Sequence, residues 1–370
     1  MATLFDYLNW RGDLRFSDNP LNEVDNLILS LFTYIDFDGI VSDEVGNAPI
    51  TLRNAARQYL YRYRGQSAYL GKIIPPDIVA LIARAAKTRR FANVGVLAHT
   101  NLVEAERQIQ FSAMTFLLDD GTSYVAFRGT DDTLVGWKEN FNMSFMQPVP
   151  AQLEALAYLE RIAPHLSGDF FVGGHSKGGN LAIYASVMCA PKWKSRIRCA
   201  YNNDGPGFDR AFVERSEYRS MSGKLRTIVP QSSVVGMLLE HEELYEVVKS
   251  SATGLLQHNA FSWEVVGPSF IHLNTISEES RLIDSSLKEW MHTITPEERE
   301  HVVDSIYETL SSVGATTLTE LTSEKIKLVK AWGTLDPKVR SILLKCISLI
   351  IRPSKKKPKE VGELPPPDAQ

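Results

Sequence analysis

One stretch of the sequence decides the fold: residues 170–179 read FFVGGHSKGG. The apolar run at its start is typical of a buried strand, and Leu181–Ala185 behind it has strong helical propensity. Between the two, residues 174–178 fit G-x-S-x-G. A nucleophilic serine on a sharp strand-to-helix turn requires small residues at the two outer positions, because larger ones would clash in the bend. A glycine-rich turn with an incidental serine is the alternative, but the strand and helix on either side favour Ser176 as a nucleophile.

Strand-like and helical segments alternate around this stretch. Residues 109–117 alternate in polarity, Asp119-Asp120-Gly121 is typical of a hairpin turn, and residues 123–127 resume as a strand. A helical pattern follows over residues 150–165. Further short strand-like runs are Ile197–Tyr201, Leu225–Val229, Leu244–Val248 and Phe261–Val266. This alternation predicts βαβ units and a largely parallel sheet.

The two ends of the chain read as helical. Residues 21–31 have the apolar stripe of an amphipathic helix, and Pro75-Pro76-Asp77 opens a second one. Beyond residue 276 the strand signals stop, and Thr295-Pro296 and Asp336-Pro337 are typical helix starts. We therefore expect an α/β domain over residues 1–276, with a helical region at 1–105 and the core motifs at 109–270. A helical appendage over 277–352 and a disordered tail over 353–370 should follow.

Composition limits the classes of function. Of the 370 residues, 44% are hydrophobic and 23% charged, which excludes a disordered or fibrous chain. The net charge of −4 argues against a nucleic-acid partner. Three cysteines, no visible secretory signal and no apolar run of ~20 residues predict a soluble cytoplasmic protein. The basic cluster Lys355, Lys356, Lys357 and Lys359 permits peripheral contact with anionic lipid, although a soluble tail is the simpler interpretation.

A serine nucleophile requires a general base, which a third group orients. After such a turn the chain order is serine, acid, histidine, so His165 is disfavoured. His292 and His301 fall in the predicted C-terminal helices, where a solvated helix face explains them. Of the rest, His258 is preferred because it lies in a loop between two strand-like runs, and His272 is the second choice. His241 follows a predicted helix, Val234–Glu240, and equally fits a partner of that helix's dipole.

The acid and the oxyanion donors are sought at other turns. Asp204 follows a predicted strand and precedes Gly-Pro-Gly, so it fits either the catalytic acid or an Asx-turn residue. Asp209 and Glu242 are next in line. Thr130 also follows a strand and fits an oxyanion donor, through its N–H and hydroxyl, or a helix N-cap, and the two roles can coexist. The backbone N–H of Lys177 would be the second oxyanion donor.

Phe127-Arg128-Gly129-Thr130 with Trp137 seven residues later, together with the Gly174–Gly179 turn, resembles the class 3 (fungal-type) lipases of the α/β-hydrolase superfamily. More narrowly, the sequence is similar to a bacterial family of lipase-like proteins lacking assigned function. The shared segments are HSKGGN (175–180), NNDGPGF (202–208), the QH loop (257–258) and the N-terminal residues 4–13.

The resemblance implies an α/β-hydrolase fold with Ser176 as nucleophile, His258 as base and Thr130 as oxyanion donor. Two departures stand out. Lys177 replaces the usual leucine, which would place a cation near the acyl chain or head group. The usual acid position reads Gln231-Ser232-Ser233, without a carboxylate. We therefore place the acid on Asp204, one strand earlier.

The expected function is a serine hydrolase that cleaves a small-molecule acyl ester or a lipid through an acyl-enzyme. This chemistry requires no cofactor and no metal ion, and none is expected. Two alternatives remain: an acyltransferase on the same triad, and a catalytically degenerate hydrolase fold that acts as a binding module.

Overall fold

The computed structural model describes residues 1–64, 70, 74–243, 245–291, 293–323, 332–333 and 335–351, and its centre is one mixed β-sheet. Over these residues the sheet has nine strands in the order β1-β2-β3-β4-β5-β6-β7-β8-β11. They are β1 (Ile50–Thr51), β2 (Gly95–Glu104), β3 (Ile109–Leu117), β4 (Ser123–Phe127), β5 (Phe170–His175), β6 (Ile197–Asn203), β7 (Leu225–Pro230), β8 (Tyr245–Val248) and β11 (His272–Leu273). Strands β4 to β8 are parallel neighbours. The predicted fold class, an α/β-hydrolase-like arrangement with a mostly parallel central sheet, is confirmed.

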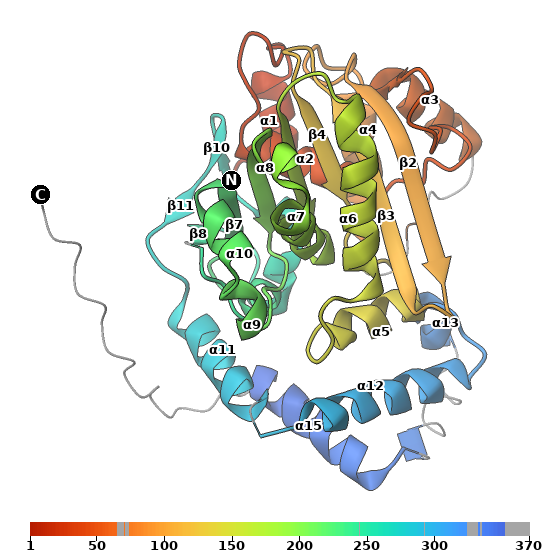
Figure 1. Ribbon diagram of the computed structural model, residues 1–370, viewed down its shortest axis with the longest axis vertical. Helices are drawn as coiled ribbons and strands as arrows, with labels where there is room; N and C mark the ends of the chain where they lie inside the picture. The colour runs from red at the N-terminus through yellow and green to blue at the C-terminus, as the bar shows by residue number, and fades with distance from the viewer. Residues whose placement is uncertain are drawn as a thin grey trace, which may run out of the picture.

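The direction of winding decides which helices cover which face. Because β4 to β8 follow one another in chain order, right-handed crossovers place their connecting helices on the same face of the sheet. Helices α6 (Pro150–Ile162) and α7 (Lys177–Met188) pack on that face, with α10 (Ser216–Met221) against α7 (Figure 1). The opposite face is left for segments from elsewhere in the chain.

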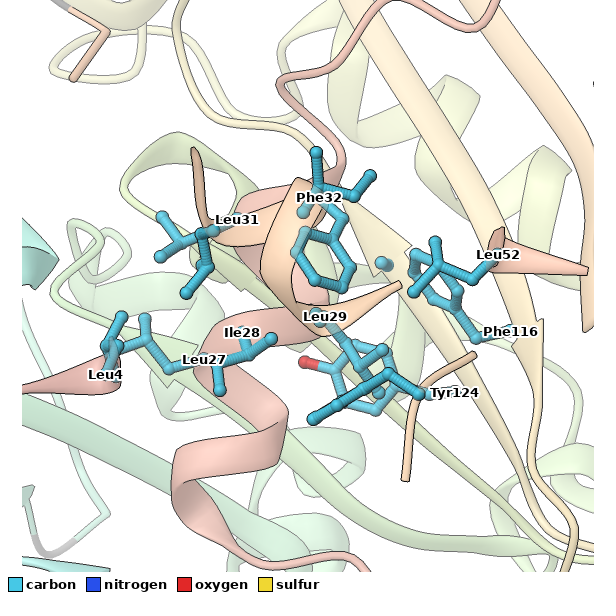
Figure 2. Packing of buried hydrophobic residues seen from close by; sticks show 14 of the residues in the cluster. Leu4, Leu27, Ile28, Leu29, Leu31, Phe32, Leu52, Phe116 and Tyr124 are labelled. Atoms are coloured by element: carbon cyan, nitrogen blue, oxygen red, sulfur yellow. The ribbon is translucent and has the colours of Figure 1, made fainter. Parts of the chain in front are cut away.

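The N-terminal helices cover this opposite face. They are α1 (Leu4–Arg11), α2 (Glu23–Phe32), α3 (Leu52–Arg62) and α4 (Asp77–Ala85). Helix α2 begins at a capping box of Asn22 and Asp25. Its residues Leu27 and Phe32 pack in one apolar cluster with Leu4 of α1 and Phe116 of β3 (Figure 2). The helices predicted at residues 21–31 and after Pro76 are confirmed.

Three local predictions are wrong. The region 1–105 is not helical throughout, because residues 95–104 form β2, which pairs along β3 with an irregularity between Leu97 and Thr100. The run 261–266 is not one strand, because residues 260–262 form a 3-10 turn and only Val265–Val266 is extended, as β9 beside β10 (Ser269–Phe270). The predicted helix 234–240 shrinks to a 3-10 turn at Val235–Met237.

The remaining helices are short connectors and the C-terminal helices. The connectors are α5 (Leu134–Asn142), α8 (Pro191–Lys194) and α9 (Arg210–Val213). The C-terminal helices are α11 (Glu278–Met291), α12 (Pro296–Ser311), α13 (Leu318–Ser323) and α15 (Pro337–Ile351). The helix starts predicted at Thr295 and Asp336 are confirmed, the first as a full capping box. The predicted tail, its lysine cluster and His292 lie outside the described residues.

The C-terminal helices lie beyond the end of the sheet at which β2 and the parallel strands finish, with α12 next to α5 (Figure 1). The Leu134 N–H donates to the Thr316 carbonyl (2.9 Å), and Leu134 packs with Val313 and Leu321. At the other side of the sheet, the Ser277 N–H donates to the Gln231 carbonyl (2.6 Å). The helices are thus attached on both sides of the carboxyl edge. Within the described part of the chain, no helix is long and apolar enough to span a bilayer.

Candidate active site

Ser176 occupies a sharp turn between β5 and α7. Its backbone has φ 59° and ψ −135°, a conformation that non-glycine residues rarely adopt and that is typical of a strained functional turn. A Cβ added to Gly174 would lie 2.2 Å from the carbonyl carbon of Gly178, and one added to Gly178 would lie 2.1 Å from the Phe127 carbonyl oxygen. Only glycine fits at both positions, which is the steric reason for the motif. Ser176 itself is 9% exposed.

A buried asparagine that the sequence analysis did not single out holds this turn. Asn203, the last residue of β6, accepts the Ser176 N–H at its carbonyl (2.9 Å), and its side-chain amide donates to the Gly174 carbonyl (2.9 Å). The Asn26 amide of α2 donates to the side-chain oxygen of Asn203 (2.8 Å). Helix α2 therefore supports the nucleophile turn through a buried polar network. The low dielectric of the protein interior strengthens the hydrogen bonds of such a network.

The structure brings Asp204 and His258 together, 54 residues apart in the chain. The Nδ1 of His258 lies 2.7 Å from Oδ2 of Asp204, and these side chains are 28% and 1% exposed. Asp204 has φ 54° and follows β6 directly, so it lies beside the Ser176 turn, which follows the neighbouring strand. The geometry is that of a carboxylate orienting an imidazole, as a general base requires.

Residues at the expected acid position support this pair. The Ser233 hydroxyl donates to Oδ1 of Asp204 (2.5 Å), so the serine that stands in place of a carboxylate orients one instead. The Ser232 N–H donates to the Gln257 side-chain oxygen (2.9 Å), and the Trp263 indole N–H donates to the Gln257 carbonyl (2.9 Å). These bonds fix the loop that presents His258.

In the described residues, no hydrogen bond joins the Ser176 hydroxyl to His258 directly. The two residues are connected by His175, whose ring centroid is 4.8 Å from that of His258 and whose Nε2 lies 2.9 Å from the His258 carbonyl oxygen. Burial, together with the nearby His258, lowers the pKa of His175 to about 3, so this ring is neutral. Nucleophile–base bonds are often long before substrate binds.

Thr130 lies in a loop against the nucleophile turn. A Cβ added to Gly129 would lie 3.0 Å from the Ser176 Cβ, so the loop approaches the serine closely. The Thr130 hydroxyl is buried and has no hydrogen-bond partner in the described part of the chain. The N-cap of α5 is Thr133, whose side chain accepts from the Gly136 N–H, so the N-cap alternative for Thr130 is wrong. An unpartnered buried hydroxyl beside a nucleophile suits an oxyanion donor.

Lys177 has two separate features. Its N–H is in the first turn of α7, where no acceptor within the helix is available, so it is free to bind an anion. The sequence predicts that its side chain lies near the acyl chain or head group, but in the structure the side chain is fully buried. The Nζ donates to Glu139 Oε2 (2.7 Å) and to the Gln110 carbonyl (2.6 Å). The lysine therefore ties α7 to α5, the helix after the oxyanion loop.

The other candidates have different partners. His272 lies 2.8 Å from Oε1 of Glu23 on α2, and Asp209 is the N-cap of α9. His241 is 3.2 Å from Glu243. Burial would raise the pKa of Glu243, but its interactions with His241 and the hydrogen bonds from Thr227 and Tyr218 together lower this pKa to about 2. Glu242, His165 and His301 are exposed. Of the histidines considered as bases that the structure describes, His258 is the one found with Asp204.

Comparisons with known proteins give one family match and a solved structure of low similarity. The Mbeg1-like family model matches residues 85–308, which include every residue from Thr130 to His258. A solved structure described as the crystal structure of M37 lipase is 14% identical, with a TM-score of 0.35, over 57% of this chain and 68% of that chain. No curated protein sequence matches the chain.

Proposed function

The chain belongs to the Mbeg1-like family, and from the site within its matched residues we propose that it is a lipase-like serine hydrolase that cleaves an ester through an acyl-enzyme. One observation supports this most: the Asp204–His258 pair at 2.7 Å stands beside a serine in a strained strand-to-helix turn. Structural ion pairs are common, but a carboxylate–histidine pair beside a serine in such a turn supports the nucleophile, base and acid roles proposed here.

In the proposed reaction, His258 accepts the Ser176 proton through Nε2 while Oγ attacks the ester carbonyl carbon. Asp204 holds the imidazolium that forms. The Thr130 hydroxyl and N–H and the Lys177 N–H stabilise the oxyanion. The alcohol leaves with the proton from His258, and water, activated by the same base, then releases the carboxylic acid and restores the serine.

The base loop favours an apolar acyl chain. Leu255 and Leu256, three and two residues before His258 in the chain, are 53% and 71% exposed. Covering two methylenes of a substrate at ~0.8 kcal/mol each corresponds to about tenfold in kcat/KM. We propose esters of medium or long acyl chains over acetates.

The test is a series of p-nitrophenyl esters from acetate to palmitate, supplemented with phospholipids. We expect equal moles of p-nitrophenolate and free acid, with kcat/KM about tenfold higher for octanoate than for acetate. Leu256→Ser should reduce this ratio, whereas Leu153→Ser, at a leucine of α6 that is 51% exposed, should not. p-Nitrophenolate without free acid would indicate an acyltransferase. No turnover of any ester would favour a binding module.

A further inference from the structure

Tyr34, just beyond the end of α2, reaches the nucleophile turn although it lies outside the residues that the family model matches. Its side chain is buried, and its hydroxyl lies 3.3 Å from Nδ1 of His175. A Cβ on Gly129 would lie 2.2 Å from the same hydroxyl, so Tyr34 also contacts the loop before Thr130. No part of the ester cleavage described above uses Tyr34 or His175.

The hydrogen-bond partners of His175 determine where its proton is. The His258 carbonyl oxygen can only accept, so Nε2 of His175, 2.9 Å away, must hold a proton. Because burial lowers the pKa of His175 to about 3, the ring is neutral and Nδ1 has no proton. Nδ1 therefore accepts, and the Tyr34 hydroxyl donates. The donor and acceptor of both hydrogen bonds are therefore fixed by the carbonyl, which can only accept, and by the single proton of the neutral ring.

The chain of two hydrogen bonds, from Tyr34 to His175 and from His175 onward, ends at the backbone carbonyl of the proposed base, His258. His258 closes the 3-10 turn Gly254–His258, and its side chain is 28% exposed, so its ring is not fixed by burial. Asp204 holds one ring nitrogen, while the hydrogen bond and ring contact from His175 fix the main chain and one face of the ring. A base that is misplaced by about 1 Å costs up to about 10²-fold in rate.

We propose that Tyr34 and His175 are positioning residues that hold His258 in place: Tyr34 donates to His175, and His175 donates to the His258 carbonyl. This inference rests on the proposed function for its effect on rate, although the two hydrogen bonds can be tested without it. It also gives the N-terminal helical region a role in the site, through a residue 141 positions from His175.

The kinetic test is a double-mutant cycle with Tyr34→Phe and His175→Gln on a p-nitrophenyl ester. Tyr34→Phe removes the donor to Nδ1 and should lower kcat about tenfold with KM within twofold. In His175→Gln, the glutamine amide can donate to the His258 carbonyl whether or not Tyr34 has a hydroxyl, because an amide has no tautomers for Tyr34 to select. Adding Tyr34→Phe to His175→Gln should therefore change kcat less than twofold. Tyr158→Phe, which removes another buried hydroxyl that donates to the Ala98 carbonyl (2.9 Å), should leave kcat within twofold. Equal losses from Tyr34→Phe in both backgrounds would overturn the proposal.

The second test needs no turnover. In ¹⁵N-histidine NMR at pH 7, with His175→Gln to assign the signals, His175 should be neutral and protonated on Nε2. Tyr34→Phe should move its Nδ1 resonance toward that of an unbonded acceptor. A proton on Nδ1 of His175, or an Nδ1 resonance unaffected by Tyr34→Phe, would overturn the proposed hydrogen bonds from Tyr34 to His175 and from His175 to His258. Absence of esterase activity alongside the expected spectra would instead overturn the proposed function, so the two failures are distinguishable.

Discussion

Replacing His258 with alanine is expected to lower kcat for p-nitrophenyl ester hydrolysis about 10³- to 10⁴-fold, because Ser176 then has no group to accept its proton. Asp204→Asn should cost a similar factor. The asparagine has the same shape, but its amide lacks the charge that stabilises the imidazolium and favours the wrong tautomer. Both effects should appear in kcat with little change in KM, measured by steady-state kinetics.

Two variants of the same kind serve as controls. His272→Ala removes a histidine bonded to Glu23, and Asp209→Asn removes the carboxylate charge at the N-cap of α9, where the asparagine oxygen still accepts the Phe212 N–H. Both should keep kcat within about twofold, since neither side chain is bonded to a member of the proposed triad. Full activity in His258→Ala, together with loss in His272→Ala, would transfer the role of base to His272. An unaffected Asp204→Asn would move the acid elsewhere.

The second large effect is on stability. Glu139→Gln is expected to lower the free energy of unfolding by about 3–5 kcal/mol, because it leaves the fully buried Lys177 ammonium without a counter-charge. Glu139 also accepts the Gln110 and Ala151 N–H groups, so the substitution disturbs three contacts of α5 at once. Urea denaturation of the full chain measures the change, through the midpoint and the slope of the unfolding curves of the variant and the wild type.

The matched control is Glu214→Gln, which breaks the exposed pair of Glu214 with Arg210 (2.7 Å) on α9 and should cost less than about 1 kcal/mol. The double variant Lys177→Met/Glu139→Gln removes both charges, and the glutamine side-chain oxygen can still accept one of the two backbone N–H groups, so it should recover part of the loss. A Glu139→Gln protein as stable as the wild type would contradict a charged, paired lysine inside the fold.

The sequence predicts best where a local rule fixes the chain. The strand–turn–helix around Ser176 is predictable because two glycines and a serine at fixed spacing fit few other structures, and Asp204 is predictable as the residue that follows a strand. His258 instead closes a 3-10 turn, and one of the two strand-like runs that placed it in a loop is not one strand. Strand β2 was missed because residues 95–104 do not alternate in polarity; its pairing with β3 determines its structure. The run 261–266 misled for the opposite reason, since its β-like composition is overridden by a turn in which Trp263 bonds back to Gln257.

Contacts between distant segments set the remaining features. Lys177 is expected from the sequence near the acyl chain or head group, and only its pairing with Glu139, 38 residues away, explains why the charge is buried. Tyr34 and Asn26 contact the nucleophile turn from the N-terminal helical region, where no motif marks them. Ser233 orients Asp204 from the position where a carboxylate was sought. No spacing rule predicts such pairs, because they depend on how segments far apart in the chain pack against one another.

The most direct test of the central claim is labelling with a fluorophosphonate probe, which reacts with activated serine hydroxyls. We expect the wild-type chain to be labelled at one site, identified as Ser176 by mass spectrometry of the modified peptide. Ser176→Ala should be unlabelled, and His258→Ala should react far more slowly. A wild-type protein that is not labelled, or a Ser176→Ala variant labelled as strongly as the wild type, would contradict the assignment of Ser176 as a nucleophile.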